Sequence, residues 1–257
     1  MIELNNIYCM DNVEGMRMLR DESIDLRVTS PPYDNLRKYN GYCFDFENVA
    51  KELYRVTKQG GVVVWVVGDA TIDGSETGTS FRQSLYFIEC GFNLHDTMIW
   101  QKANPMPQVK TSRYNQVFEY MFVFSKGSPK TFNPILVECK CGGNGYNSTC
   151  KNMDGESGRT KKSFVINKTK YDDNIWRIAI AQNKTGHPAV FPEEIAVRHI
   201  KSWSNDGDVV LDCFMGSGTT AKVARALGRK YIGFEISKEY CDLANKRLQD
   251  TKTLFDL

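Results

Sequence analysis

The chain has 257 residues, 41% of them hydrophobic, which suits one α/β domain with an insertion or two small domains. Its 33 basic and 31 acidic side chains leave a formal charge of +2, so the overall composition does not indicate a polyanionic partner. No run of about 18 apolar residues is present, which excludes a predicted membrane span. The N-terminus does not resemble a signal peptide. Of the eight scattered cysteines, four lie inside apolar segments and are expected to be small buried side chains: Cys9, Cys90, Cys213 and Cys241. A reduced, cytoplasmic protein is therefore expected.

Short apolar runs alternate with amphipathic stretches along most of the chain. Runs rich in β-branched and aromatic residues predict strands at Asn6–Asp11, Ile24–Ser30, Gly61–Asp69, Leu94–Lys102, Glu119–Lys126, Asp208–Asp212 and Lys230–Ile236. Apolar residues at three- and four-residue spacing predict helices at Phe46–Lys58, Ser80–Cys90, Pro192–Trp203, Ser217–Leu227 and Ser237–Leu248. This alternation predicts a doubly wound sheet.

The second predicted strand ends in the motif Thr29-Ser30-Pro31-Pro32-Tyr33. The exocyclic amine of cytosine or adenine is a poor nucleophile until acceptors hold its N–H bonds. Ser30 Oγ and the carbonyl of Pro31 can be those acceptors, the prolines remove competing N–H groups, and Tyr33 offers a face for an extruded base. The motif therefore indicates a base-amine pocket, with a proline turn that ends a buried strand as the alternative interpretation.

The stretch from Gly127 to Gly186 interrupts the alternation. Between Lys126 and Lys184 there are eleven basic and five acidic side chains, so the rest of the chain is slightly acidic. A basic insertion is typical of a module that contacts phosphates, although a solvated lysine-rich surface has the same composition. Within it, Phe164–Asn167 and Asn174–Ile180 are possible short strands. Cys139, Cys141 and Cys150 lack zinc-ligand spacing, so no metal is expected.

The strand at Asp208–Asp212 is followed by the turn Cys213-Phe214-Met215-Gly216-Ser217-Gly218-Thr219-Thr220. Glycines let a backbone approach a ligand, and the next helix begins with free N–H groups. The strand that follows ends in Glu235, whose carboxylate could accept both hydroxyls of a ribose. The alternative is that Glu235 only caps the helix at Ser237.

These motifs, and their order in the chain, resemble the β class of DNA amino-methyltransferases, in which the catalytic motif precedes the cofactor motif. The resemblance spans nearly the whole chain apart from residues 127–186. It implies a Rossmann-like α/β fold that uses S-adenosyl-L-methionine, with a mostly parallel doubly wound sheet, an antiparallel last strand and a small insertion. The implied organisation is a catalytic half at 1–126, a target-recognition insertion at 127–186 and a cofactor-binding half at 187–257.

The resemblance also implies roles for individual residues. The catalytic set is Ser30, Pro31, Pro32 and Tyr33. The cofactor set is Asp11, Asp212, Cys213, Phe214, Gly216, Ser217, Gly218, Thr219, Thr220, Glu235 and Pro188. Asp11 is the position that faces the adenine amine in relatives, although they usually carry Gly-Asp where this chain has Met10-Asp11. The DNA-contact set is Arg37, Lys38 and Tyr39 in the loop after the catalytic motif, with Lys161 and Lys162 in the insertion.

The implied activity is site-specific methylation of a flipped base in double-stranded DNA. Relatives with Ser-Pro-Pro-Tyr mostly modify N4 of cytosine, so Ser30 favours that amine, with N6 of adenine as the alternative. No proline precedes a cysteine, which argues against carbon methylation of cytosine. A methyltransferase for RNA or protein glutamine usually has the reverse motif order, and a catalytically silent DNA-binding protein would not need the intact pocket. A restriction–modification context, a cognate restriction endonuclease and a homodimer are further expectations from the resemblance.

Overall fold

The computed structural model describes residues 2–32, 44–105, 107, 112–151, 159–180 and 192–249, with only the backbone at 146–151 and 159–162. It contains two compact units. The first combines Met1–Asn133 with Asn174–Leu257, and the second is Pro134–Asp173. The insertion expected at 127–186 therefore encloses the second unit.

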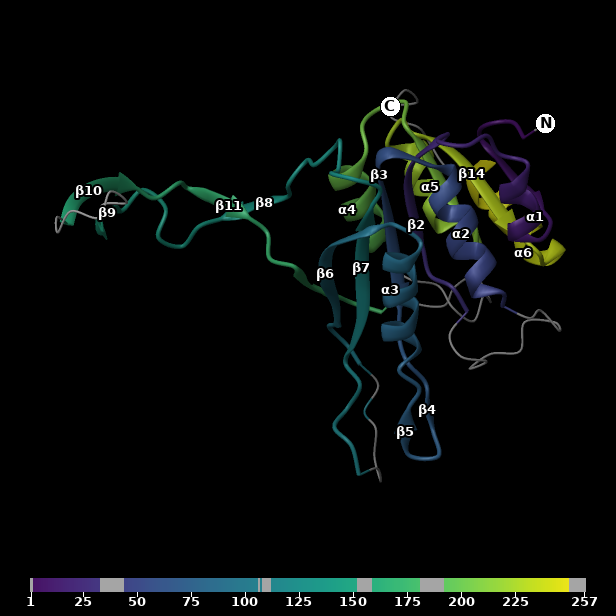
Figure 1. Cartoon of the computed structure of the whole chain (residues 1–257), viewed down its shortest axis with the longest axis horizontal. Helices are drawn as coiled ribbons and strands as arrows, with labels where there is room; N and C mark the ends of the chain where they lie inside the picture. Colours follow the sequence, from purple (N-terminus) through teal and green to yellow (C-terminus); the bar gives the residue numbers. More distant parts are fainter. Residues whose placement is uncertain are drawn as a thin grey trace. The chain divides into compact units, whose positions relative to one another are not determined.

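An eight-stranded sheet forms the centre of the first unit (Figure 1). Its strands, in spatial order, are β1 (Asn6–Cys9), β14 (Lys230–Glu235), β13 (Val209–Asp212), β2 (Ile24–Thr29), β3 (Thr57–Val67), β7 (Phe118–Ser125), β6 (Asn93–Lys102) and β12 (Ile175–Ile178). Among these strands only β7 runs antiparallel to its neighbours. The expected mostly parallel sheet with an antiparallel strand is confirmed, but that strand is β7, which lies inside the sheet and is followed in the chain by β12, β13 and β14.

Helices cover both faces of this sheet, as a doubly wound fold requires. α1 (Asn12–Arg17), α2 (Phe46–Val56) and α3 (Thr79–Glu89) pack on one face. α4 (Glu193–Trp203), α5 (Thr219–Ala226) and α6 (Lys238–Gln249) pack on the other. The central strand β3 is buried along Val62–Val67, which explains its unbroken apolar run.

Three expectations from the sequence need correction. The helix expected at Phe46–Lys58 ends at Val56, because Thr57 is extended, starts β3 and donates its hydroxyl to the Leu53 carbonyl at 2.6 Å. Helix α1 was not expected, since six residues are too few for a helical period to show. Cys9 is exposed and Cys90 half-buried, although both lie in apolar runs; only Cys213 and Cys241 of that group are buried.

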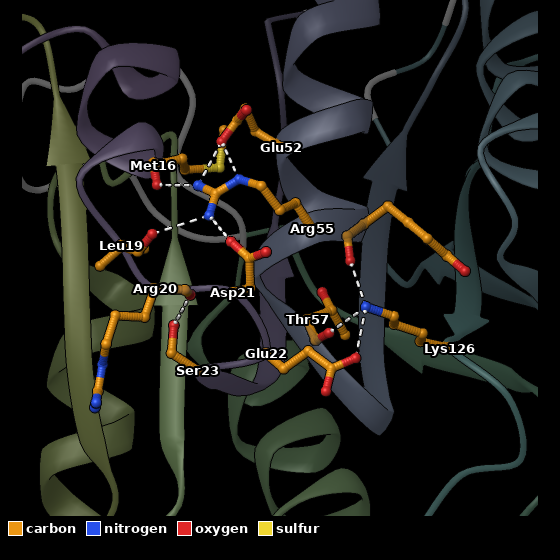
Figure 2. A network of polar contacts seen from close by, with 11 residues as sticks. Met16, Leu19, Arg20, Asp21, Glu22, Ser23, Glu52, Arg55, Thr57 and Lys126 are labelled. Carbon is orange, nitrogen blue, oxygen red and sulfur yellow. Dashed lines mark hydrogen bonds and ion pairs between the residues drawn. The ribbon is translucent and has the colours of Figure 1, made fainter.

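The link from α1 to β2 is held by the end of α2, as Figure 2 shows. Arg55 donates to the carbonyls of Met16 at 2.7 Å and Leu19 at 3.0 Å, at and just after the end of α1. Lys126, on the far side of β3, donates to the Thr57 carbonyl at 3.1 Å and pairs with Glu22. These contacts fix where β2 enters the sheet, and therefore where the predicted motif at its end emerges.

The second unit consists of two antiparallel pairs. β8 (Leu136–Glu138) pairs with β11 (Thr169–Tyr171), and β9 (Gly145–Lys151) pairs with β10 (Arg159–Val165). A further hairpin, β4 (Thr71–Ile72) with β5 (Ser75–Glu76), belongs to the first unit. The possible strand at Asn174–Ile180 is real but lies outside the second unit: as β12 it pairs with β6 of the central sheet.

No helix among the described residues has the length and apolarity to cross a membrane.

Candidate active site

The two strands that end in the predicted catalytic and cofactor motifs are neighbours. β2 pairs in parallel with β13, with Leu26 opposite Val210 and Arg27 opposite Leu211. Where both strands end, Thr29 Oγ1 donates to Asp212 Oδ1 at 2.6 Å. Carboxyl ends of parallel strands share one edge of a sheet, so the motifs that follow them emerge side by side. The structure therefore brings Ser30 next to the turn at 213–218, which is distant in the sequence.

The turn after β13 is folded around the Asp212 side chain. Its Oδ1 also accepts the N–H of Phe214 at 3.0 Å. Gly216 and Gly218 have φ of +51° and +81°, and Gly218 caps α5. A Cβ on Gly218 would lie 2.8 Å from the Cβ of Ala244 on α6, so glycine is required there for both conformation and packing.

Glu235, at the end of β14, binds the same turn from the other side. Its Oε2 accepts the Gly216 N–H at 2.8 Å, and its Oε1 accepts the Ser237 N–H at 2.9 Å. Burial raises the pKa of Glu235, while these two N–H donors oppose the rise. The helix-capping alternative is thus part of what Glu235 does, but each carboxylate oxygen keeps a second acceptor site for a ligand hydroxyl.

Asp11 lies near Glu235, because Cys9 of β1 is opposite Glu235 of β14. Its Oδ1 accepts the N–H groups of Val13 at 2.8 Å and Glu14 at 3.1 Å, so it caps α1. This structural role was missed in the sequence because α1 was not predicted. The half-buried carboxylate still has acceptor capacity for an amine.

Burial sets the charges beneath the turn. It raises the pKa of Asp212, and hydrogen bonds from Thr29 and Thr220 oppose the rise. Arg27 is 1% exposed, its guanidinium has no hydrogen-bond partner among the described residues, and burial lowers its pKa. Burial also raises the pKa of Cys213 to about 12, so that thiol stays neutral and serves as core rather than as a nucleophile.

The structure places part of the predicted catalytic and DNA-contact sets. Ser30 and Pro32 are half-buried and Pro31 is buried directly after β2. Lys161 and Lys162 lie on β10 of the second unit, where their side chains are not described. The predicted residues Tyr33, Arg37, Lys38, Tyr39 and Pro188 lie outside the described residues.

Two contributors escaped the sequence analysis. Thr29 was noted only as a neighbour of Ser30, yet its buried hydroxyl joins the two motifs. Arg247 of α6 donates to the Ser217 carbonyl at 2.5 Å and to its hydroxyl at 2.8 Å, which holds the middle of the turn. No local pattern distinguishes Arg247 from other basic residues at a helix end.

Comparison with known proteins agrees with this geometry. A family model of N6/N4 methyltransferases, described as DNA methylase, matches residues 24–246. The orphan methyltransferase M.BamHII of Bacillus amyloliquefaciens is 57% identical over an alignment of 243 residues that covers 90% of this chain and 90% of its own. The type II methyltransferase M.HinfI of Haemophilus influenzae is 28% identical over 284 residues, covering 97% of this chain and 69% of its own.

Two solved structures share the fold. The PvuII DNA methyltransferase, described as cytosine-N4-specific, superimposes with a TM-score of 0.70 at 23% identity, over 94% of this chain and 85% of its own. A putative DNA modification methylase from Thermus thermophilus, complexed with S-adenosyl-L-methionine, gives 0.65 at 22% identity, over 96% and 93%. With a family model that matches most of its length and a relative at 57% identity, the chain belongs to the N6/N4 family of DNA methylases.

Proposed function

We propose that this DNA methylase moves a methyl group from S-adenosyl-L-methionine to the exocyclic amine of a flipped base in duplex DNA, and that the amine is N4 of cytosine. The observation that carries the proposal is the hydrogen bond between Thr29 and Asp212. It joins the end of the strand that leads into Ser30 to the start of the cofactor turn. A methyl donor held by the turn and an amine held by the motif at Ser30 can therefore meet.

The residues around the turn fit the proposed cofactor. Gly218, with positive φ, starts α5, and the first turn of α5 offers N–H groups and a partial positive charge to a carboxylate. Glu235 and Asp11 are acceptors for ribose hydroxyls and an adenine amine at adjoining strand ends. Phe214, half-buried against Phe44 with ring centroids 5.3 Å apart, adds an apolar wall. When bound, S-adenosyl-L-methionine supplies an electrophilic methyl group on its sulfonium.

The chain's own residues then prepare the amine. Ser30 Oγ and the Pro31 carbonyl accept its N–H bonds, which favours a tetrahedral nitrogen with a free lone pair. Tyr33 stacks on the base outside the duplex. No covalent nucleophile is involved, so the acceleration comes from positioning and electrostatics.

The choice of cytosine rests on Ser30, by the resemblance to enzymes with Ser-Pro-Pro-Tyr, and N6 of adenine is the alternative. DNA methylated by the purified protein, digested to nucleosides and analysed by mass spectrometry, distinguishes the two. We expect N4-methyldeoxycytidine; N6-methyldeoxyadenosine would overturn the assignment of the base. Single-molecule sequencing of DNA from cells that express the chain would give the recognition site.

Transfer of radiolabel from cofactor to DNA tests the pocket. Ser30→Ala and Tyr33→Ala should abolish transfer while cofactor affinity is kept, because neither residue belongs to the cofactor turn. Lys51→Ala is a matched control, since Lys51 is exposed on α2 and its ion pair with Glu47 is a long one, at 3.9 Å. Labelling that survives in both pocket variants would refute the proposed catalytic motif, and label on RNA but not duplex DNA would refute the substrate.

We further propose that Arg37, Lys38 and Tyr39 contact DNA together with Lys161 and Lys162 of the insertion at 127–186. Unchanged DNA affinity and salt dependence in Arg37→Ala/Lys38→Ala would contradict the loop's role.

A homodimer stays a prediction, as does a restriction–modification context with a cognate endonuclease. The relative M.BamHII is described as an orphan methyltransferase, which favours action without a companion nuclease.

A further inference from the structure

Two thiols from distant parts of the chain meet beside Glu235. Cys9 ends β1, and its Sγ lies 3.8 Å from the carbonyl oxygen of Ile236. Cys241 is in the first turns of α6, and its Sγ lies 3.4 Å from the carbonyl oxygen of Glu235. The two thiols thus donate to the carbonyls of consecutive residues, and each lies within electrostatic reach of the other.

The two cysteines differ in exposure, which suits a two-step oxidation. Cys9 is exposed and accessible to a small oxidant, whereas Cys241 is 3% exposed and lies behind it. Lys238 and Asp242 form an ion pair at 3.0 Å beside the two thiols. Once Cys9 is oxidised to a sulfenic acid, the neighbouring Cys241 thiol can resolve that product.

We propose that Cys9 and Cys241 form a peroxide-sensitive thiol pair that closes to a disulfide. Cys9 sulfur attacks a peroxide oxygen and breaks the O–O bond, which gives a sulfenic acid and one water. Cys241 sulfur then attacks Cys9 sulfur, and the departing hydroxyl takes the Cys241 proton as a second water. Two thiols are oxidised by two electrons in total, and hydrogen peroxide is reduced to two waters.

The disulfide would act on the cofactor site, and this part of the inference rests on the proposed function. Closing the bond removes both thiol hydrogens, so the carbonyls of Glu235 and Ile236 lose these donors. It also ties β1 to α6 across the backbone of Glu235, whose side chain holds Gly216. We therefore expect the oxidised protein to bind S-adenosyl-L-methionine more weakly, and dithiothreitol to restore the affinity.

The test is peptide mapping of the full-length protein after brief treatment with hydrogen peroxide. We expect a linked peptide pair that contains Cys9 and Cys241, lighter by two hydrogens than the reduced pair and absent from Cys9→Ser and Cys241→Ala. Cys9 is exposed, so its serine variant should fold normally. Cys90→Ser and Cys139→Ser/Cys141→Ser are the controls and should form the link as the native chain does. Oxidation that stops at a Cys9 sulfinic acid, or that links other cysteines, would overturn the thiol pair.

Calorimetric titration with S-adenosyl-L-methionine tests the coupling separately. The native chain should lose affinity severalfold after peroxide and regain it with dithiothreitol, while Cys9→Ser should keep its affinity throughout. Equal affinity of the linked and reduced forms would refute the coupling and leave the disulfide standing. A reduced protein that binds no cofactor would instead refute the proposed function, because the peptide map does not depend on it.

Discussion

At the scale of single residues, buried polar groups decide how the site is held. Thr29 and Asp212 are both buried, and their hydrogen bond is the direct link between the catalytic and cofactor motifs. A buried carboxylate is costly unless donors surround it, so each donor to Asp212 stabilises the ionised form. The same residues therefore contribute to folding and to the geometry of the site.

Replacing Thr29 with valine removes one donor to Asp212 and conserves the shape of the side chain. We expect a loss of about 1–3 kcal/mol in the free energy of unfolding at neutral pH, measured with urea. Burial raises the pKa of Asp212, and the loss of the Thr29 hydroxyl should raise it further. The variant therefore loses stability mainly when Asp212 is ionised in the folded protein. The stability difference from the native chain should shrink as the pH falls and Asp212 is protonated in both proteins.

Thr57→Val is the matched control for that measurement. Thr57 is also buried, but its hydroxyl donates to the Leu53 carbonyl rather than to a carboxylate. Its variant should lose stability with little dependence on pH and should keep its cofactor affinity. A pH-independent difference for Thr29→Val would contradict the role assigned to its hydroxyl.

His199 gives a second prediction about pH. It is fully buried on α4, beside Met121 and the ring of Trp176, and burial lowers its pKa from 6.5 to about 3. Between pH 6.5 and about 3, His199 therefore binds a proton in the unfolded chain but stays neutral in the folded chain. Stability from this group is complete above pH 6.5 and is lost as the pH falls from 6.5 towards 3, by up to about 1.4 kcal/mol per pH unit.

Urea unfolding at about pH 7 and about pH 5.5, on either side of the ordinary histidine pKa, checks this, with His199→Leu as the comparison. The leucine variant cannot take up the proton, so it should lose less stability between the two pH values than the native chain. The same loss in both proteins would show that another group titrates over this range.

At the scale of elements, short connections at the ends of strands depend on side chains from elsewhere. Side chains hold α1 at both ends. Asp11 caps its first turn, and Arg55 donates to the carbonyls of Met16 in its last turn and of Leu19 just after it. Six residues of helix have little stability of their own, so packing and these caps maintain it. This arrangement explains why α1 escapes a periodicity search and yet positions Asp11 at the site.

Arg55→Met should weaken the α1 end of the first unit. It removes the donors to Met16 and Leu19 but conserves the apolar stem of the side chain. We expect a loss of about 1–3 kcal/mol in unfolding free energy and faster hydrogen exchange at the amides of α1. Lys51→Met, an exposed change on the same helix, is the control and should alter neither. Unchanged hydrogen exchange at the amides of α1 would show that Arg55 does not stabilise this helix.

At the scale of the whole molecule, the second unit should add DNA contacts to those of the first unit and should take no part in cofactor binding. Lys161→Ala/Lys162→Ala on β10 should weaken DNA binding and reduce the slope of log affinity against log salt by about one to two. Cofactor affinity should not change. Lys51→Ala/Lys230→Ala, in the first unit, removes the same charge and should leave the salt slope as it is; equal slopes in both variants would contradict the division of roles.

Local patterns were sufficient to predict the fold class and the main motifs, because periodicity, turn chemistry and strand-end residues can be recognised in the sequence. The family followed from the resemblance of those motifs and of their order. The alternation of strands and helices predicted the doubly wound sheet, and Ser30-Pro31-Pro32 and Gly216-Ser217-Gly218 identified the two motifs.

Which strands are neighbours became known from the folded chain alone. Folding brings Thr29 to Asp212, places β12 in the central sheet, sets Arg247 against Ser217 and brings the thiols of Cys9 and Cys241 to the carbonyls of consecutive residues. These contacts join residues far apart in the chain, and a local pattern cannot encode them because they depend on strand order and on packing between the layers.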